Sequence, residues 1–240
     1  ALEGLQKANI QFVTGVPDSL LKDICAAFYC LLKPEQHVIA SSEGAAVGLA
    51  MGHYLATAQP ALVYMQNSGL GNAVNPIASL ADPLVYAVPM VLLIGWRGEL
   101  LEDQSQLKDE PQHLKQGRIT LTQLETLGIP YVVIDCHTNS ISQVLRQACE
   151  NSVARRGPVA IVVRKNTFKS FESSSQDANA AELNREDAIR HIVEHLPPDA
   201  CVISTTGMAS RELFEIRKNA GSGHQRDFLT VGGMGHASQI

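Results

Sequence analysis

The chain has 240 residues, of which 45% are hydrophobic and 18% are charged, and its formal net charge at pH 7 is −5. A chain of this kind can bury a sizeable core, whereas its acidic balance argues against a surface for nucleic acid or for an anionic membrane. The five cysteines are dispersed without a CxxC pair, which predicts reduced thiols in the cytoplasm rather than disulfides or a zinc site. No apolar run reaches the roughly 18 residues that a transmembrane helix needs.

Short apolar runs alternate with helix-sized segments over the first two thirds of the chain. After an N-terminal helix within residues 1–11, we expect six strands, at 11–15, 37–40, 61–65, 89–95, 129–135 and 158–164. We expect helices between them at 17–32, 43–58, 67–82 and 139–152, and a long polar loop at 95–117. This alternation predicts an α/β domain with a mainly parallel sheet flanked by helices.

The composition changes after the last of these strands. Residues 166–184 are polar and rich in Ser and Asn, which is typical of a linker between domains. We therefore divide the chain into a first domain at 1–165, the linker, and a second α/β domain at 185–240. Two strands and two helices are too few to cover both faces of a parallel sheet. We expect the second domain to be incomplete within this sequence.

Glu43 stands where the strand 37–40 gives way to the helix 43–58. One interpretation is structural: Ser41 or Ser42 caps the helix, and a carboxylate in the first turn complements the helix dipole. The other is functional, because ligands of parallel sheets collect at the carboxyl ends of the strands. The turns GVPDS and QNSGLGN fall at the same ends.

Each further candidate also has a structural and a functional interpretation. Asp18 in GVPDS belongs either to a plain turn or to a ligand site. The turn QNSGLGN either allows tight packing of a helix against the sheet or lets Asn67 orient a flat ligand. That turn lacks the full GxGxxG fingerprint, so it is a weak dinucleotide signal. In the polar segment 95–117, Arg97 could clamp an anion and His113 could exchange protons near neutral pH.

Two similar turns follow the expected strands of the second domain. STTGMASRE and TVGGMGHAS combine hydroxyl side chains with glycines at the start of a helix-sized segment. Backbone N–H groups at helix N-termini bind phosphate without a lysine. The repetition of this arrangement favours a phosphate site, with His236 as a candidate donor.

Taken together, seven segments resemble the thiamine-diphosphate (ThDP) dependent 2-oxoacid decarboxylases, and most closely those that act on 3-phosphonopyruvate. These segments, in chain order, are GVPDSLL, SSEGAAVGLAMGHYLAT, LVYMQNSGLGNAVNPIASLADP, VLLIGWRGE, KDEPQHLKQG, STTGMASRELFE and FLTVGGMGHAS. The resemblance covers nearly the whole chain. It implies a ThDP-binding fold, with a pyrimidine-binding domain at 1–165 and the start of a diphosphate-binding domain at 185–240.

The resemblance also implies roles for individual residues. Glu43 matches the glutamate that activates the aminopyrimidine of the cofactor, and His113 matches an active-site histidine. Asp18 and Arg97 belong to the substrate side, where Arg97 would pair with the phosphonate. The remaining expected cofactor contacts are Asn67, Thr205, Thr206, Gly233, Met234 and His236. Among them, Met234 matches the residue that supports the bent cofactor.

Magnesium and the reaction follow from the same resemblance. The metal motif of the family, GDG followed by Asn, is expected beyond Ile240, so no metal ligand is assigned in this chain and we expect the chain alone to be inactive. The full-length form would convert 3-phosphonopyruvate to phosphonoacetaldehyde and CO₂. Alternatives are sulfopyruvate or another anionic 2-oxoacid as substrate, and a non-catalytic truncated paralogue that acts as a binding or regulatory partner. A homodimer or larger homo-oligomer with the site between subunits is implied.

Overall fold

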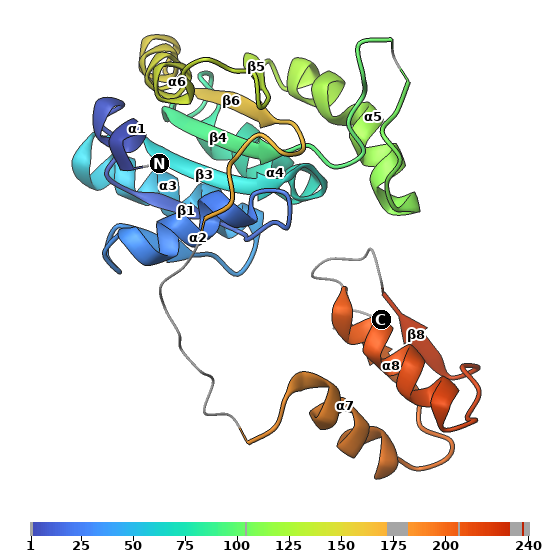
Figure 1. The fold of residues 1–240 in the computed structure, drawn as a ribbon. Coiled ribbons are helices and arrows are strands. Elements are labelled where there is room, and N and C mark those ends of the chain that lie inside the picture. The colour runs from blue at the N-terminus through green and yellow to red at the C-terminus, as the bar shows by residue number, and fades with distance from the viewer. Residues whose placement is uncertain (1, 104, 172–181, 206, 231–236, 238–240) are drawn as a thin grey trace. The chain divides into compact units, whose positions relative to one another are not determined.

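The computed structural model describes residues 2–103, 105–171, 182–205, 207–230 and 237 (Figure 1). The chain forms two compact units, Ala1–Ser175 and Gln176–Ile240, and each is described by itself. The boundary between the units falls within the segment expected to be a linker, and the domain limits drawn from the sequence stay a prediction.

Unit 1 is built on a parallel sheet whose strand order is β2-β1-β3-β4-β6-β5. Its strands are β1 (Val13–Gly15), β2 (His37–Ile39), β3 (Ala61–Gln66), β4 (Met90–Gly95), β5 (Tyr131–Ile134) and β6 (Pro158–Val163). Every strand pair in this sheet is parallel. The predicted parallel α/β architecture is confirmed.

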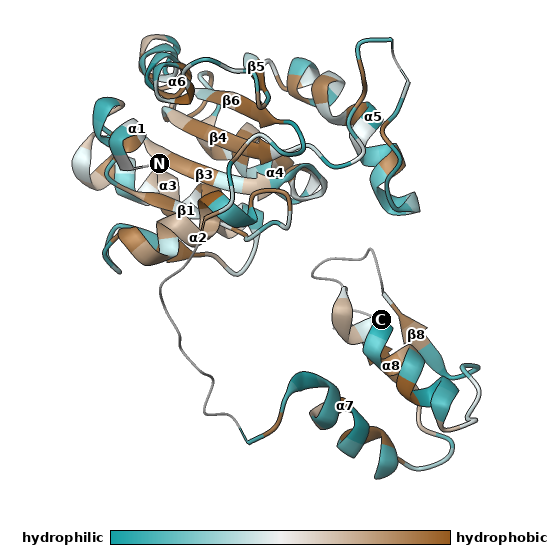
Figure 2. Ribbon diagram, viewed as in Figure 1, coloured by the Kyte–Doolittle hydropathy of each residue, from teal (hydrophilic) through white to brown (hydrophobic). Residues whose placement is uncertain are grey.

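Helices cover both faces of this sheet and enclose a core on each side (Figure 1). One core includes side chains of α3 (Glu43–Thr57), α4 (Leu70–Pro76) and α5 (Pro111–Thr126). The other includes side chains of α1 (Leu2–Lys7), α2 (Lys22–Leu31) and α6 (Ile141–Arg155). All residues of β3, β4 and β6 are buried, and Figure 2 shows β4 and β6 as hydrophobic over much of their length. Strands covered on both faces need such continuous apolar runs.

Two expected helices differ from the structure at their ends. Helix α2 begins at Lys22 rather than at residue 17, because the Asp18 carboxylate accepts the backbone N–H groups of Leu20 and Leu21 and forms a turn there. The helix expected at 67–82 consists of three successive segments: the 3₁₀ turn η1 (Asn67–Gly69), α4, and the π-helical turn η2 (Ile77–Ala81). Pro76 ends α4 and lacks the N–H that a continuous helix would use.

The polar segment 95–117 was expected to be a loop throughout, and this is wrong for its last third. Helix α5 begins at Pro111, a residue that suits the first position of a helix because its missing N–H is not needed there. His113 therefore lies in the first turn of a helix rather than on a loop.

Unit 2 pairs β7 (Val202–Ser204) with β8 (Asp227–Leu229) in parallel, and its helices are α7 (Arg185–Glu194) and α8 (Met208–Asn219). A bidentate ion pair between Arg185 and Glu212 joins the two helices. In neither unit does the described part of the chain contain a helix of the length and hydropathy required to cross a membrane.

Candidate functional site

Four neighbouring strands of unit 1 bring polar side chains to one edge of the sheet. Glu43 follows β2, Asp18 follows β1, Asn67 follows β3 and Arg97 follows β4. These strands are adjacent in the order β2-β1-β3-β4 and run parallel. Their carboxyl ends therefore meet at the same edge, where ligands of open α/β sheets bind.

Glu43 opens α3 and is almost completely buried, with 3% of its surface exposed. The Ser42 hydroxyl accepts the backbone N–H of Ala45 at 3.2 Å, so the structure confirms Ser42 as the helix cap. Oε2 of Glu43 accepts a hydrogen bond of 3.0 Å from Asn72, whereas Oε1 makes none with the described residues. A Cβ atom at Gly69 would lie 2.2 Å from Oε1. The carboxylate therefore rests on the turn after β3, in a space that exists because residue 69 is glycine.

Asp18 is buried at the end of β1, with 5% of its surface exposed. Its Oδ1 accepts a hydrogen bond of 2.7 Å from the side chain of Gln66, the last residue of β3. A Cβ atom at Gly95 would lie 2.3 Å from Oδ2, so a glycine makes room for this carboxylate too. Burial raises the pKa of Asp18 above its usual value. Sequence reasoning missed Gln66, although a polar residue at the end of a buried strand was a usable signal.

The Asn67 side chain bridges three elements. Its Oδ1 accepts the backbone N–H of Arg97 at 3.1 Å, and its Nδ2 donates to the Arg97 carbonyl at 3.0 Å. The same Nδ2 donates to the hydroxyl of Thr120 on α5 at 2.9 Å. The amide thus holds the ends of β3 and β4 against α5, and its expected cofactor contact stays a prediction.

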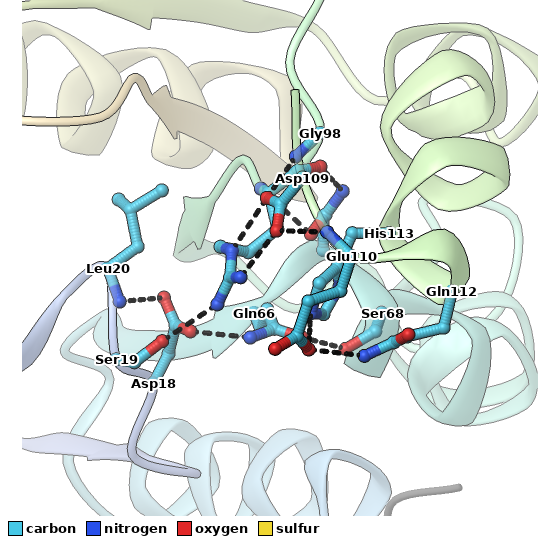
Figure 3. Close-up of polar contacts among 12 residues, drawn as sticks. Asp18, Ser19, Leu20, Gln66, Ser68, Gly98, Asp109, Glu110, Gln112 and His113 are labelled. Carbon is cyan, nitrogen blue, oxygen red and sulfur yellow. Dashed lines mark hydrogen bonds and ion pairs between the residues drawn. The ribbon is translucent and has the colours of Figure 1, made fainter. Parts of the chain in front are cut away.

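Arg97 forms a bidentate ion pair with Asp109, a residue that no sequence motif singled out. Figure 3 shows Asp109 together with Asp18, Glu110 and His113. The Nε–Oδ2 and Nη2–Oδ1 distances are 2.8 and 2.5 Å, and Nη1 donates to the Ser19 hydroxyl at 3.0 Å. The pair raises the pKa of Arg97 and holds the pKa of Asp109 well below its usual range. Because a guanidinium has five N–H donors, part of its capacity is left for an anion.

His113 lies in the first turn of α5 and is buried, with 7% of its surface exposed. Its Nε2 is 3.9 Å from Oε2 of Glu110, beyond hydrogen-bond distance, and its buried Nδ1 has no hydrogen-bond partner among the described residues. Burial, and next the positive charge of Arg97, lower the pKa of His113. These effects favour a neutral imidazole, which can both accept and donate a proton.

Helix α5 is held against the segment after β4 by close backbone contacts. The Trp96 indole donates to the Gly117 carbonyl at 2.8 Å, and the Gln106 amide donates to the carbonyls of Gly98 and Leu114 at 2.6 and 2.7 Å. A Cβ atom at Gly117 would lie 1.8 Å from the Gly98 carbonyl oxygen. This contact fixes the position of His113 relative to Arg97.

Thr205 belongs to unit 2, where it is exposed directly after β7 and its carbonyl accepts the Ser210 hydroxyl at 2.6 Å. The other candidates of this unit, Thr206, Gly233, Met234 and His236, lie outside the described residues. The structure thus gathers Glu43, Asp18, Asn67, Arg97 and His113 at or beside one sheet edge in unit 1. That edge combines a buried carboxylate, a buried imidazole and a guanidinium, a set suited to proton exchange and to anion binding.

Residues 1–118 match the family described as thiamine pyrophosphate enzyme, N-terminal TPP binding domain. The chain is 31% identical to phosphonopyruvate decarboxylase from Streptomyces viridochromogenes over 254 aligned positions, which cover 99% of this chain and 60% of that protein. It is 34% identical to sulfopyruvate decarboxylase subunit alpha from Methanococcus maripaludis over 167 positions, which cover 68% of this chain and 93% of that subunit. The chain therefore spans 60% of the length of the first relative and nearly all of the second.

Among solved structures, the chain is similar to the thiamine diphosphate-dependent 4-hydroxybenzoylformate decarboxylase of Rhodococcus jostii RHA1. The TM-score is 0.50 at 19% identity, and the match covers 88% of this chain and 39% of that one. At this level of identity the likeness concerns the fold alone.

The contact between Gly69 and Glu43 predicts a strong effect of one added methyl group. Gly69→Ala forces the buried carboxylate to move, and we expect the free energy of unfolding to fall by about 1–3 kcal/mol, as overpacking does in cores. Gly71→Ala is the matched control: nothing lies within 4 Å of its added Cβ, and we expect no loss of stability there. Urea unfolding followed by the fluorescence of Trp96, the only tryptophan, reports on unit 1. Equal stabilities of the two variants would contradict the contact.

The environment of His113 predicts a depressed imidazole pKa. In an NMR titration, we expect His113 to titrate below the value of about 6.5 of an unperturbed histidine. Because the unfolded chain then binds this proton more readily than the folded one, His113 contributes a loss of stability as the pH falls below about 6.5. Arg97→Gln should raise the pKa of His113, since the guanidinium lowers it. Arg146→Gln on the exposed face of α6 is the control. A His113 pKa above that of a model histidine would refute this account.

Proposed function

Because the chain belongs to the thiamine-diphosphate-dependent decarboxylase family, we propose that the protein containing it decarboxylates 3-phosphonopyruvate to phosphonoacetaldehyde and CO₂. The observation that carries this proposal is the Glu43 carboxylate. It is buried at the carboxyl edge of the sheet, with one oxygen held by Asn72 and the other without a partner among the described residues.

The residues present fit the cofactor at this edge. ThDP, when bound, supplies an electron sink for the bonding pair that CO₂ leaves behind. Glu43 would hold and exchange a proton with the aminopyrimidine of the cofactor through Oε1, which has no hydrogen-bond partner among the described residues. The low exposure of Glu43 favours such an exchange, because little water reaches the carboxylate to compete for the proton.

The neighbouring side chains supply proton transfer and anion binding. His113 offers Nδ1, which has no hydrogen-bond partner in the described part of the chain, for a proton at the substrate. Arg97 uses the N–H groups that remain beside Asp109 and Ser19 to bind the phosphonate. We assign Asp18 to the substrate side as well, because it interacts electrostatically with Arg97 and His113 and is held by Gln66.

The remaining parts of the proposal concern the cofactor and the assembly. We assign Asn67, Thr205, Thr206, Gly233, Met234 and His236 to the cofactor, on the family motifs that they match. Mg²⁺, which requires oxygen ligands, would accompany the diphosphate of the cofactor, and we assign no residue of this chain to it. A second copy would complete the site, which makes the protein a homodimer or a larger homo-oligomer.

Sulfopyruvate is the second candidate substrate. The match to a sulfopyruvate decarboxylase subunit extends over 93% of that subunit, and a guanidinium binds a sulfonate as well as a phosphonate. Both substrates are small anionic 2-oxoacids, so the site residues have the same roles in either case.

Glu43→Gln tests the carboxylate directly. We expect the variant to fold and to lose at least about 10²-fold in kcat for CO₂ release with ThDP and Mg²⁺, the usual scale for loss of a proton-transfer group. Glu35→Gln replaces an exposed carboxylate and should leave kcat unchanged. The assay uses the whole protein that carries this chain. Wild-type turnover by Glu43→Gln would overturn the assigned role.

A substrate panel tests the choice of acid. Decarboxylation of 3-phosphonopyruvate, sulfopyruvate and pyruvate is compared through kcat/KM. We expect 3-phosphonopyruvate to be preferred, and both it and sulfopyruvate to exceed pyruvate, because pyruvate lacks a second anionic group. Arg97→Gln should reduce this advantage by raising KM only for the two substrates that carry the second anionic group. A clear preference for sulfopyruvate would refute 3-phosphonopyruvate as the substrate, but it would not contradict decarboxylation of a 2-oxoacid.

A further inference from the structure

Helix α7 of unit 2 carries a cluster of metal-ligating side chains that the proposed decarboxylation does not use. His191, Glu194 and His195 each offer one ligand atom, and the three atoms lie within 4.8 Å of one another. In the described part of the chain, no other group of His, Cys, Asp and Glu meets this criterion. The three residues follow one another at the i, i+3 and i+4 spacing that places side chains on one helix face.

A hydrogen bond prepares one of the two imidazoles as a ligand. Nδ1 of His195 lies 2.7 Å from the carbonyl oxygen of His191. A carbonyl only accepts, so Nδ1 carries the proton and Nε2 presents its lone pair. Metal-bound histidines in proteins are oriented in this way, by donation of the other ring N–H to a carbonyl or carboxylate. The two rings are close, with centroids 4.4 Å apart.

The donor set selects the class of ion. Two imidazole nitrogens and one carboxylate oxygen suit Zn²⁺ and its neighbours in the transition series, whereas Mg²⁺ requires oxygen ligands. Zinc ligands at about 2.0–2.2 Å in a tetrahedral arrangement lie roughly 3.4 Å apart. The three side chains are exposed, and small rotations would bring their ligand atoms from within 4.8 Å of one another to this spacing. Water can take the fourth position.

The position on the helix also favours a cation. His195 is the residue that follows the last residue of α7, and its backbone N–H bonds to the Ile192 carbonyl. The last carbonyls of a helix carry a partial negative charge that stabilises a positive ion. Glu194 makes no ion pair with the described residues, so its carboxylate does not have to leave a partner.

We propose that His191, Glu194 and His195 form a site for a divalent transition-metal ion, with Zn²⁺ as the best-suited ion. Its ligands are mainly nitrogen, unlike the oxygen ligands that Mg²⁺ requires. A bound ion would connect the side chains of His191, Glu194 and His195 across the last turn of α7.

Isothermal titration of Zn²⁺ into the 240-residue chain, without an affinity tag and with excess Mg²⁺ present, tests the proposal. We expect the wild-type chain to bind one more Zn²⁺ than the double variant His191→Asn/His195→Asn. Each single His variant should weaken this binding by at least about tenfold, through loss of one of three ligands. Replacement of the exposed His137 by Asn is the matched control and should leave the extra Zn²⁺ bound.

Exposed thiols are present in every variant, so only the difference between variants counts. A second measurement needs no substitution: the imidazole resonances of His191 and His195 should shift together as Zn²⁺ is added. Equal Zn²⁺ binding by the wild type and the double variant, or a titration that leaves both resonances in place, would overturn the proposal. Neither result bears on the proposed decarboxylation, whose residues lie elsewhere.

Discussion

The side chain of Asn67 connects the ends of the two central strands, and the candidate site is arranged around it. The β3–β4 ladder ends with Gln66 opposite Gly95. One residue further on, the side-chain amide of Asn67 replaces the backbone amide of a further ladder residue. It hydrogen-bonds to both the N–H and the carbonyl of Arg97. Its further bond to Thr120 extends the connection to α5. The position of His113 on α5 thus depends on the strand register.

Two glycines set a second constraint, because each leaves the space that a buried carboxylate fills. Gly69 lies against Glu43, and Gly95 lies against Asp18. In both cases the glycine belongs to the end of one strand or the turn after it, and the carboxylate follows another strand. A side chain at either glycine would displace an acid, so the site requires a particular residue at positions that carry no chemistry themselves.

The sequence was sufficient to predict the features that depend on local signals. Apolar runs in the sequence identified β3, β4 and β6. Glu43 and Asp18 were singled out because each follows an expected strand. The contacts of Gln66 and Asp109 were not predicted, because they depend on partners brought together by the fold: Gln66 is 48 residues from Asp18 in the chain. The start of α5 did have a local signal, Pro111, but the high charge of the segment favoured a loop.

Burial, more than net charge, determines the electrostatics of the sheet edge. It raises the pKa of Asp18 and lowers that of His113, so in both groups the neutral form is favoured relative to water. Arg97 and Asp109 neutralise each other as a pair. The guanidinium nevertheless keeps N–H donors that neither Asp109 nor Ser19 uses, and these are available to an anion at this edge. In this way a protein with a net charge of −5 can present a site compatible with a doubly anionic ligand.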